Sequence, residues 1–316
     1  MNDPANSALA GNELRDTLIA AAATLGRWEL VGQVASGGMT DVFRARPKGA
    51  DRSEAPYAIK VLKPAWQGEA AAEALLRREF EASAAVRHRS LMTVLYVERN
   101  EATCWTVMPW LEGFTLADLL CGDALPHSAA LWYARQVAEA LDAMHQVGWM
   151  HGDVKPANVI VSPEGHATLI DLGFARRTED QRGLHRHGWG TPQYIAPEAI
   201  TSSLLPDIRS DLYSLGVMLY EALSGRRPFD ASDVSALVRQ HRYTRPCPLQ
   251  LAVPALPKPI TDLVDRLLAK EPLRRPQTPS EVISILARAE ISTLAERSRL
   301  RLSQREATPV VVSIGV

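Results

Sequence analysis

The stretch HGDVKPANVIVSPEGHATLIDLG, residues 151–173, decides the interpretation of this 316-residue chain. Asp153 and Asn158 interrupt apolar surroundings, and Asp171 follows two apolar residues at the end of a predicted strand. A carboxylate in such surroundings costs several kcal/mol unless it is paired or bound to a metal. Each acid alone is more typical of a loop cap. Two acids, a lysine and an asparagine around one predicted hairpin instead indicate a Mg²⁺ site, because Mg²⁺ binds one or two protein carboxylates together with substrate phosphates.

A second signal lies upstream, where the chain alternates like a set of strands. Gly37 and Gly38 lie in a turn between two predicted strands, and glycines let a backbone approach a polyphosphate closely. Two adjacent glycines are more often only a turn. Lys60 lies inside an apolar strand, where alternation places it on the face opposite its immediate neighbours. Glu79 on the following predicted helix is able to pair with Lys60, with Glu81 as the alternative.

The order of elements predicts a two-lobed α+β chain. Strand-like runs cover residues 28–34, 41–47, 57–62, 91–98 and 103–110, and a helix is predicted over 69–87. After residue 111 the pattern becomes mainly helical, at 128–147, 207–224, 231–241, 260–269 and 279–290. We therefore divide the chain into a helical or disordered extension (1–26), a first lobe (27–111), a second lobe (112–290) and a tail (291–316).

Composition narrows the class of protein. The 35 basic and 36 acidic residues give a net charge of −1, which argues against a surface that binds nucleic acid or anionic membrane. The sequence contains no apolar run long enough to span a bilayer, and a secretory signal is not expected. Cys104, Cys121 and Cys247 form no CxxC pair, so we expect a cytoplasmic location.

Together these motifs resemble those of bacterial Hanks-type Ser/Thr protein kinases, in the family's order from Val31 to about Leu286. The resemblance implies a bilobal fold, with a small antiparallel-sheet N-lobe carrying one helix and a larger, mainly helical C-lobe. It implies ATP with Mg²⁺, for which Mn²⁺ could substitute, bound between the lobes. It also implies transfer of the γ-phosphoryl group to Ser or Thr hydroxyls of a protein substrate. A homodimer is left open, and neither nucleic acid nor membrane insertion is expected.

The resemblance assigns roles to the residues of the central stretch. Asp153, in His151-Gly-Asp153, matches the residue that accepts or orients the substrate hydroxyl proton. Lys155 would stabilise the transferring phosphoryl group, and Asn158 and Asp171 would hold the metal. Thr191, in the segment Gly190–Tyr194 where substrate docks in the family, combines with Lys155 as in Ser/Thr kinases. The catalytic set is therefore Lys60, Glu79, Asp153, Lys155 and Thr191.

The resemblance also implies an ATP site and two scaffold positions. Lys60 would contact the α- and β-phosphates, Pro109 would offer its carbonyl to adenine, and Leu111 would offer its N–H. The full predicted set for ATP is Val34, Ala35, Ser36, Gly37, Gly38, Val42, Ala58, Lys60, Met108, Pro109, Leu111, Asn158 and Asp171. Asp211 and Arg275 match structural positions of the family, and Arg275 would pair with Glu198.

Two departures from the family pattern carry expectations. Ala35 and Thr40 stand where the family's phosphate loop has glycines, so we expect weakened nucleotide affinity. Gly152 replaces the arginine that receives an activation-loop phosphate in the family, and Thr178 is the single hydroxyl residue within 174–190. We therefore expect activity without phosphorylation of that loop.

Two other classes of function remain open. His-Gly-Asp also opens the catalytic loop of aminoglycoside-type small-molecule kinases, but Lys155-Pro156, Gly190-Thr-Pro192 and Ala196-Pro-Glu198 favour a protein substrate. A pseudokinase that acts as a scaffold would explain Ala35 and Gly152. Against it, a non-catalytic chain has little need for so many charged groups at the motif positions.

Overall fold

A computed structural model describes residues 24–51, 53–101, 103–121, 123–179, 191–201 and 205–292. They divide into two compact units, described separately here: residues up to 80 together with 94–110, and residues 81–93 together with those from 111 onward. The predicted extension and tail lie mostly outside the described residues. Thr24–Leu25 form a strand rather than the end of the predicted helix, because they pair with Trp28 and Glu29.

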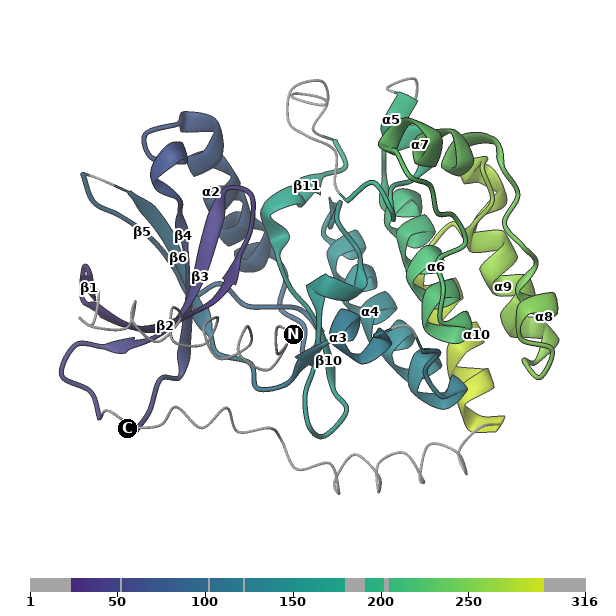
Figure 1. Ribbon diagram of the computed structural model, residues 1–316, viewed down its shortest axis with the longest axis horizontal. Coiled ribbons are helices and arrows are strands. Elements are labelled where there is room, and N and C mark those ends of the chain that lie inside the picture. Colours follow the sequence, from purple (N-terminus) through teal and green to yellow (C-terminus); the bar gives the residue numbers. More distant parts are fainter. Residues whose placement is uncertain are drawn as a thin grey trace, which may run out of the picture. The chain divides into compact units, whose positions relative to one another are not determined.

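The first unit is built on an antiparallel six-stranded sheet in the order β1-β2-β3-β4-β6-β5 (Figure 1). Its strands are β1 (Thr24–Leu25), β2 (Trp28–Ser36), β3 (Thr40–Pro47), β4 (Tyr57–Leu62), β5 (Tyr96–Arg99) and β6 (Cys104–Pro109), and the short helix η1 (Pro64–Trp66) follows β4. The strand predicted over 91–98 is too long at its start. Leu91 instead bridges to Leu169, and the Met92 N–H donates to the Leu169 carbonyl at 2.8 Å.

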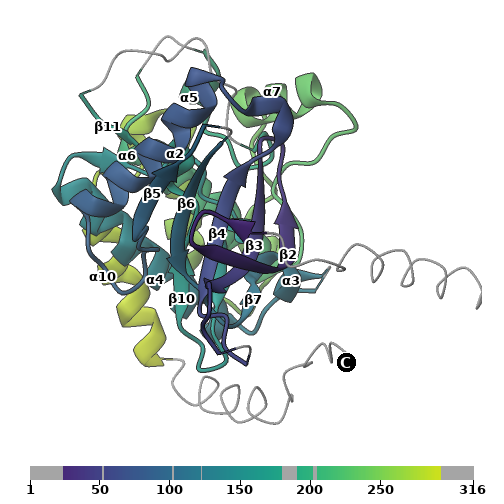
Figure 2. The same ribbon diagram turned by 90° about the vertical axis from the view of Figure 1, so that its left-hand side faces the viewer.

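Side chains alternate between the two faces of this sheet, as its β-branched and aromatic strands predict. Ile59, Trp105 and Val107 form a buried cluster on one face. Leu62 and Cys104 pack on the other face against Leu76 of α2 (Ala70–Ala85), the helix beside β4 and β6 in Figures 1 and 2. The face that carries Leu62 also carries Lys60, since the two residues are separated by one position.

The second unit is mainly helical. Its helices are α3 (Leu116–Leu120), α4 (His127–Gln146), α5 (Pro197–Thr201), α6 (Ile208–Ser224), α7 (Val234–Tyr243), α8 (Leu249–Ala252), α9 (Lys258–Leu267) and α10 (Pro279–Ser292). Its short strands are β7 (Phe114–Thr115), β8 (Trp149–Met150), β9 (Val159–Val161), β10 (Ala167–Leu169) and β11 (Arg176–Arg177). Three single-turn helices, η2 (Pro156–Asn158), η3 (Leu172–Phe174) and η4 (Pro272–Arg274), complete it.

Helix α6 forms the centre of this unit and is apolar around most of its circumference, as a fully buried helix must be. It begins where the Asp207 carboxylate accepts a hydrogen bond from the Arg209 N–H at 2.8 Å, and it ends at Gly225, whose φ is 73°. The predicted long helices are confirmed within three residues at each end, and the predicted hairpin is β9–β10. No helix among the described residues is long and apolar enough to cross a bilayer.

Candidate active site

Four of the residues predicted to bind ATP share one face of the first unit's sheet. Val42 pairs in register with Lys60, and Ala58 pairs with Met108. Directly paired residues of an antiparallel sheet point to the same side, and Ala58 and Lys60 are two positions apart on one strand. Val42, Ala58, Lys60 and Met108 therefore line up across β3, β4 and β6, which is the arrangement that a flat ring stacked on a sheet would need.

An ion pair holds Lys60 on this face. Its Nζ lies 3.3 Å from Oε2 of Glu79, whose side chain is 1% exposed. The alternative Glu81 is exposed. A buried carboxylate needs a cation, and here it fixes the position of an ammonium group that would otherwise move freely on its flexible stem.

The glycine turn between β2 and β3 is unstrained. Neither Gly37 nor Gly38 has a positive φ, and the Gly37 N–H donates to the Thr40 carbonyl at 2.8 Å. Ala35 and Thr40 lie in extended strands, so their side chains cause no backbone strain. If Ala35 and Thr40 weaken nucleotide affinity as expected, the cause is therefore only the space that their side chains occupy near a bound phosphate.

Replacement of Gly37 with Ala should leave folding intact and weaken ATP binding. A Cβ at Gly37 meets its nearest atom, the Thr40 carbonyl oxygen, at 3.5 Å, which is an ordinary contact. A methyl group on the turn would keep a phosphate from approaching the backbone N–H groups. We expect an unchanged melting temperature and a KM for ATP raised about threefold to tenfold, and Gly32→Ala on β2, where φ is not positive and an added Cβ meets nothing within 4 Å, is the control. An unchanged KM would remove the turn from the ATP site.

In the second unit, Asp211 of α6 holds the backbone of the catalytic loop. Its two carboxylate oxygens accept the N–H groups of His151 and Gly152 at 2.7 and 2.8 Å. His151 is fully buried, and its Nε2 faces the Ile170 carbonyl oxygen at 3.1 Å. Burial raises the pKa of the Asp211 carboxyl, and the two backbone hydrogen bonds act in the opposite direction.

Lys155 and Thr191, two of the residues predicted to carry catalysis, converge on the Asp153 carboxylate, which is buried. Lys155 Nζ lies 2.6 Å from one carboxylate oxygen of Asp153 and 2.6 Å from the Thr191 hydroxyl. The other oxygen accepts the Thr191 N–H at 3.0 Å. Asn158 Nδ2 donates to the Asp153 backbone carbonyl at 2.8 Å and to its carboxylate at 3.0 Å. This network fixes a base, a cation and a hydroxyl within hydrogen-bond distance of one another.

Gly152 occupies a conformation that only glycine adopts without strain. Its φ is +82°, and a Cβ added there would lie 2.7 Å from the Phe174 carbonyl oxygen. The expectation for this residue considered only the missing arginine. The structure adds that the backbone, held by Asp211 on one side, takes a left-handed turn immediately before Asp153.

Gly152→Ala should therefore destabilise the second unit by more than about 1 kcal/mol, because alanine adds strain at a positive φ and a clash with backbone. We expect a lowered melting temperature together with reduced turnover, since Asp153 is the next residue. Gly225→Ala, which introduces similar strain at the end of α6 (φ 73°), is the control for stability alone. Equal turnover in the two variants would contradict a specific role for the turn at Gly152.

Asp171 and Asn158, the predicted metal ligands, are joined through the backbone of the hairpin. The N–H of Ile170 donates to the Asn158 carbonyl at 2.9 Å. Among the described residues, Asp171 is the one non-glycine residue with a positive φ, 64°, a strained conformation of the kind found at functional sites. The side-chain nitrogen Nδ2 of Asn158 donates to Asp153, so the side-chain oxygen Oδ1 of Asn158 is the atom suited to a metal. One carboxylate and one amide oxygen fit Mg²⁺ that also binds substrate phosphates.

The described residues contain no group of three or more His, Cys, Asp or Glu side chains that could hold a metal by themselves. A dedicated all-protein metal cage is therefore not present in that part of the chain.

The segment after Thr191 is anchored to α6 by contacts that the motifs did not reveal. The Tyr194 hydroxyl donates to Glu221 at 2.6 Å, and the Ser214 hydroxyl donates to the Tyr194 carbonyl at 2.8 Å. Burial and the bond to Glu221 raise the pKa of the Tyr194 phenol, and burial raises the pKa of the Glu221 carboxyl. Ser214 and Glu221 lie on α6 at a spacing of seven residues, the one signal that could have predicted a shared face.

The two units thus hold two separate sets of the predicted residues. The first carries Lys60 with Glu79, the glycine turn and the strand residues up to Pro109; the second carries Leu111 and the network around Asp153.

Comparison with known proteins agrees with this arrangement. Residues 28–285 match the family model described as protein kinase domain. The serine/threonine-protein kinase Pkn2 of Myxococcus xanthus is 35% identical over 274 residues, which cover 84% of this chain and 32% of the relative. PknB of Mycobacterium leprae is 32% identical (83% and 43%), and PrkC of Bacillus subtilis is 26% identical (87% and 41%). The chain belongs to the protein kinase domain family, in its bacterial Hanks-type branch, and spans less than half the length of these relatives.

Proposed function

We propose that this chain is an ATP-dependent Ser/Thr protein kinase. The observation that carries the proposal is the contact of Lys155 with both the Asp153 carboxylate and the Thr191 hydroxyl. In the proposed function this carboxylate serves as the base, beside a cation and at the start of the segment that docks protein substrates in the family. A small-molecule kinase has no need for such a segment.

The reaction would be an in-line transfer that depends on positioning and electrostatics. Asp153 would orient the substrate hydroxyl and accept its proton, while Lys155 would neutralise charge on the phosphoryl group in transit. Asn158 and Asp171 would hold Mg²⁺, which when bound neutralises phosphate oxygens. Lys60, fixed by Glu79, would bind the α- and β-phosphates.

Adenine recognition would use the end of β6. Met108 is buried beside Ala58, and Pro109 closes the strand opposite Tyr57. Proline can offer only a carbonyl, which suits the amino group of adenine, and the Leu111 N–H would supply the complementary donor. Val34, Ala35, Ser36, Gly37 and Gly38 would cover the nucleotide from the turn.

We further propose that activity does not require phosphorylation of the loop 174–190. The Asp153 network is held by direct contacts, Gly152 offers no guanidinium for a phosphate, and the Thr178 hydroxyl donates to the Gly148 carbonyl at 3.2 Å.

All three cysteines are free, as expected in a reducing cytoplasm, which supports the proposed cytoplasmic location.

Thr178→Ala should retain at least half of the wild-type turnover, because the hydroxyl makes one hydrogen bond and has no arginine at position 152 to pair with a phosphate. The measurement is the initial rate of phosphate transfer by the wild type and by Thr178→Ala, before and after treatment with a phosphatase. A loss of tenfold or more, caused by the substitution or by the phosphatase, would show that phosphorylation matters.

The test of the function is incubation of the wild type, Lys60→Met and Asp153→Asn with Mg²⁺–ATP and a mixed protein substrate, followed by mapping of phosphorylated sites. We expect phosphoserine and phosphothreonine with the wild type alone. Phosphate transfer to an aminoglycoside but not to protein would favour the small-molecule kinase. No transfer and no thermal stabilisation by Mg²⁺–ATP would favour the pseudokinase.

A further inference from the structure

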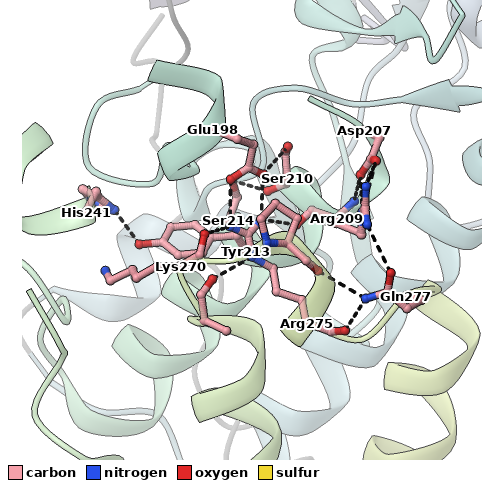
Figure 3. Close-up of polar contacts among 12 residues, drawn as sticks. Glu198, Asp207, Arg209, Ser210, Tyr213, Ser214, His241, Lys270, Arg275 and Gln277 are labelled. Carbon is pink, nitrogen blue, oxygen red and sulfur yellow. Dashed lines mark hydrogen bonds and ion pairs between the residues drawn. The ribbon is translucent and has the colours of Figure 1, made fainter. Parts of the chain in front are cut away.

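Helix α7 presents an outer face that none of the catalytic motifs accounts for. Leu237 and His241 are its buried residues. The Tyr213 hydroxyl of α6 lies 2.9 Å from Nδ1 of His241 (Figure 3), and the Phe229 ring packs edge-on against the imidazole. These contacts fix which side of α7 faces inward, so the stripe with positions 235, 239, 242 and 243 lies on the outside.

This outer stripe is basic and aromatic. Arg239 is exposed, and Arg242 and Tyr243 lie three and four positions later, on the same side of the helix. The Arg242 guanidinium lies 4.7 Å from the centre of the Tyr243 ring, and Tyr243 is 68% exposed. Stacking on the ring restricts Arg242 and holds its donors at the surface. Arg245, also exposed, follows the end of the helix. We call Arg239, Arg242, Tyr243 and Arg245 the basic face.

The surrounding sequence offers the basic face no carboxylate. Residues 234–261 contain neither Asp nor Glu, although the whole chain has 36 acidic and 35 basic residues. The two acids that border this run are engaged, since Asp233 caps the start of α7 and Asp262 pairs with Lys258. Among the described residues, no acid forms an ion pair with an arginine of the basic face.

A structural role explains only part of this pattern. A cation in the last turn of a helix interacts favourably with the helix dipole, which accounts for Arg242. Arg239 lies one turn earlier, Arg245 lies past the helix end, and like charges on neighbouring turns repel each other. Carboxylates from another molecule would balance all three charges.

The basic face lies near the segment that would receive a protein substrate. Residues 191–196 lead directly into α5, and α7 packs beside α5 in the second unit (Figure 1). A polypeptide held at residues 191–194 would therefore have α7 as a neighbour. Exposed charges beside a binding segment attract partners of opposite charge and suppress partners of like charge.

We propose that the basic face is a docking surface for an acidic segment of the protein substrate, apart from the residues that receive the substrate hydroxyl. This inference rests on the proposed function, because it concerns how a protein substrate is chosen. Arg239 and Arg242 would bind carboxylates, and Arg245 would extend the surface. None of these side chains belongs to the predicted ATP site or to the Asp153 network, so the effect falls on KM for the substrate and not on KM for ATP.

The experiment uses probes that differ only in charge. The Ser/Thr library peptide that the wild type phosphorylates fastest is joined through a flexible Gly-Ser linker to a run of glutamates, and the matched probe carries glutamines instead. Each run is attached to the N-terminal end in one probe and to the C-terminal end in another, because a docking segment can lie on either side of the phosphorylated residue.

Three double variants test whether the basic face reads this charge. Arg239→Gln with Arg242→Gln removes two of its charges. Arg87→Gln with Arg288→Gln is the matched control, since it removes two exposed arginines elsewhere in the second unit. Arg239→Lys with Arg242→Lys keeps the charges and should keep most of the preference. Should the first variant fail to fold, Arg245→Gln, a change outside the helix, takes its place.

We expect the wild type to have a KM about threefold to tenfold lower for the glutamate probe than for the glutamine probe at one of the two ends, as a few exposed ion pairs contribute. Arg239→Gln with Arg242→Gln should bring the two KM values within twofold, and Arg245→Gln should at least halve their ratio. The control should keep the wild-type ratio. At about 1 M salt, where the screening length is about 3 Å, the wild-type ratio should also fall within twofold.

The outcomes separate this inference from the proposed function. A wild type that phosphorylates no peptide would overturn both. An active wild type with equal KM values for the two probes at both ends would overturn the inference alone, as would an equal loss of preference in the control variant. With equal KM values, a self-association or an oligonucleotide affinity that the first variant abolishes would assign the basic face to a second copy or to nucleic acid instead.

Discussion

Asp153→Asn should lower kcat by about 10²- to 10⁴-fold, the contribution typical of a positioned general base. Asparagine has the same shape but accepts no proton. Its amide group would also face two donors, since Lys155 Nζ and Asn158 Nδ2 lie 2.6 and 3.0 Å from the same carboxylate oxygen. The variant therefore loses the base and the alignment of Lys155 together.

Nucleotide binding should survive this change, because none of the phosphate-binding roles falls to Asp153. Thermal stabilisation by Mg²⁺–ATP is the measurement that separates the two effects, with initial rates of phosphate transfer alongside. Asp262→Asn is the matched control, since it breaks an exposed Lys–Asp pair of similar length, 2.7 Å. Turnover within tenfold of the wild type would remove Asp153 from its assigned role.

The proximity of several candidate site residues could be predicted because their spacing along the chain is short. Asp153, Asn158 and Asp171 lie within a single loop and hairpin, so the local sequence determines their proximity. Glu79 could be predicted from its place on the helix after Lys60. The side chains of Asn158 and Asp153 meet, as do those of Lys60 and Glu79, and Asp171 directly follows Ile170, whose N–H donates to the Asn158 backbone carbonyl.

The supports of the site could not be predicted, because they depend on contacts between distant parts of the chain. Nothing near Tyr194 in the sequence reveals its hydrogen bond to Glu221, 27 positions later. The conformation of Gly152 follows from Asp211, 59 positions later. The run from Leu91 has strand-like composition, but its hydrogen bonds go to the hairpin residue Leu169. Periodicity carries no information about such partners.

Glu198 and Arg275 are also far apart in the sequence, but the resemblance to the family implied that they pair. The structure adds how deeply the pair is buried and how many hydrogen bonds it makes. Two parallel hydrogen bonds join them, at 2.6 and 2.7 Å, and Arg275 is 1% exposed. Its guanidinium also donates to the backbone carbonyls of Ala269, Arg209 and Lys270. This single side chain connects α5 with the first turn of α6 and with the loop after α9.

Arg275→Met should consequently destabilise the second unit by about 3–5 kcal/mol, the cost of leaving a buried carboxylate without its partner. The urea midpoint is the measurement. Arg266→Met is the matched control, because its pair with Glu281 has the same 2.6 Å length at 44% and 39% exposure, and such surface pairs contribute about 1 kcal/mol or less. The double variant Glu198→Gln with Arg275→Met should recover part of the loss, since no charge then remains unpaired. Equal midpoints for Arg275→Met and Arg266→Met would show that the buried pair contributes no more than a surface contact.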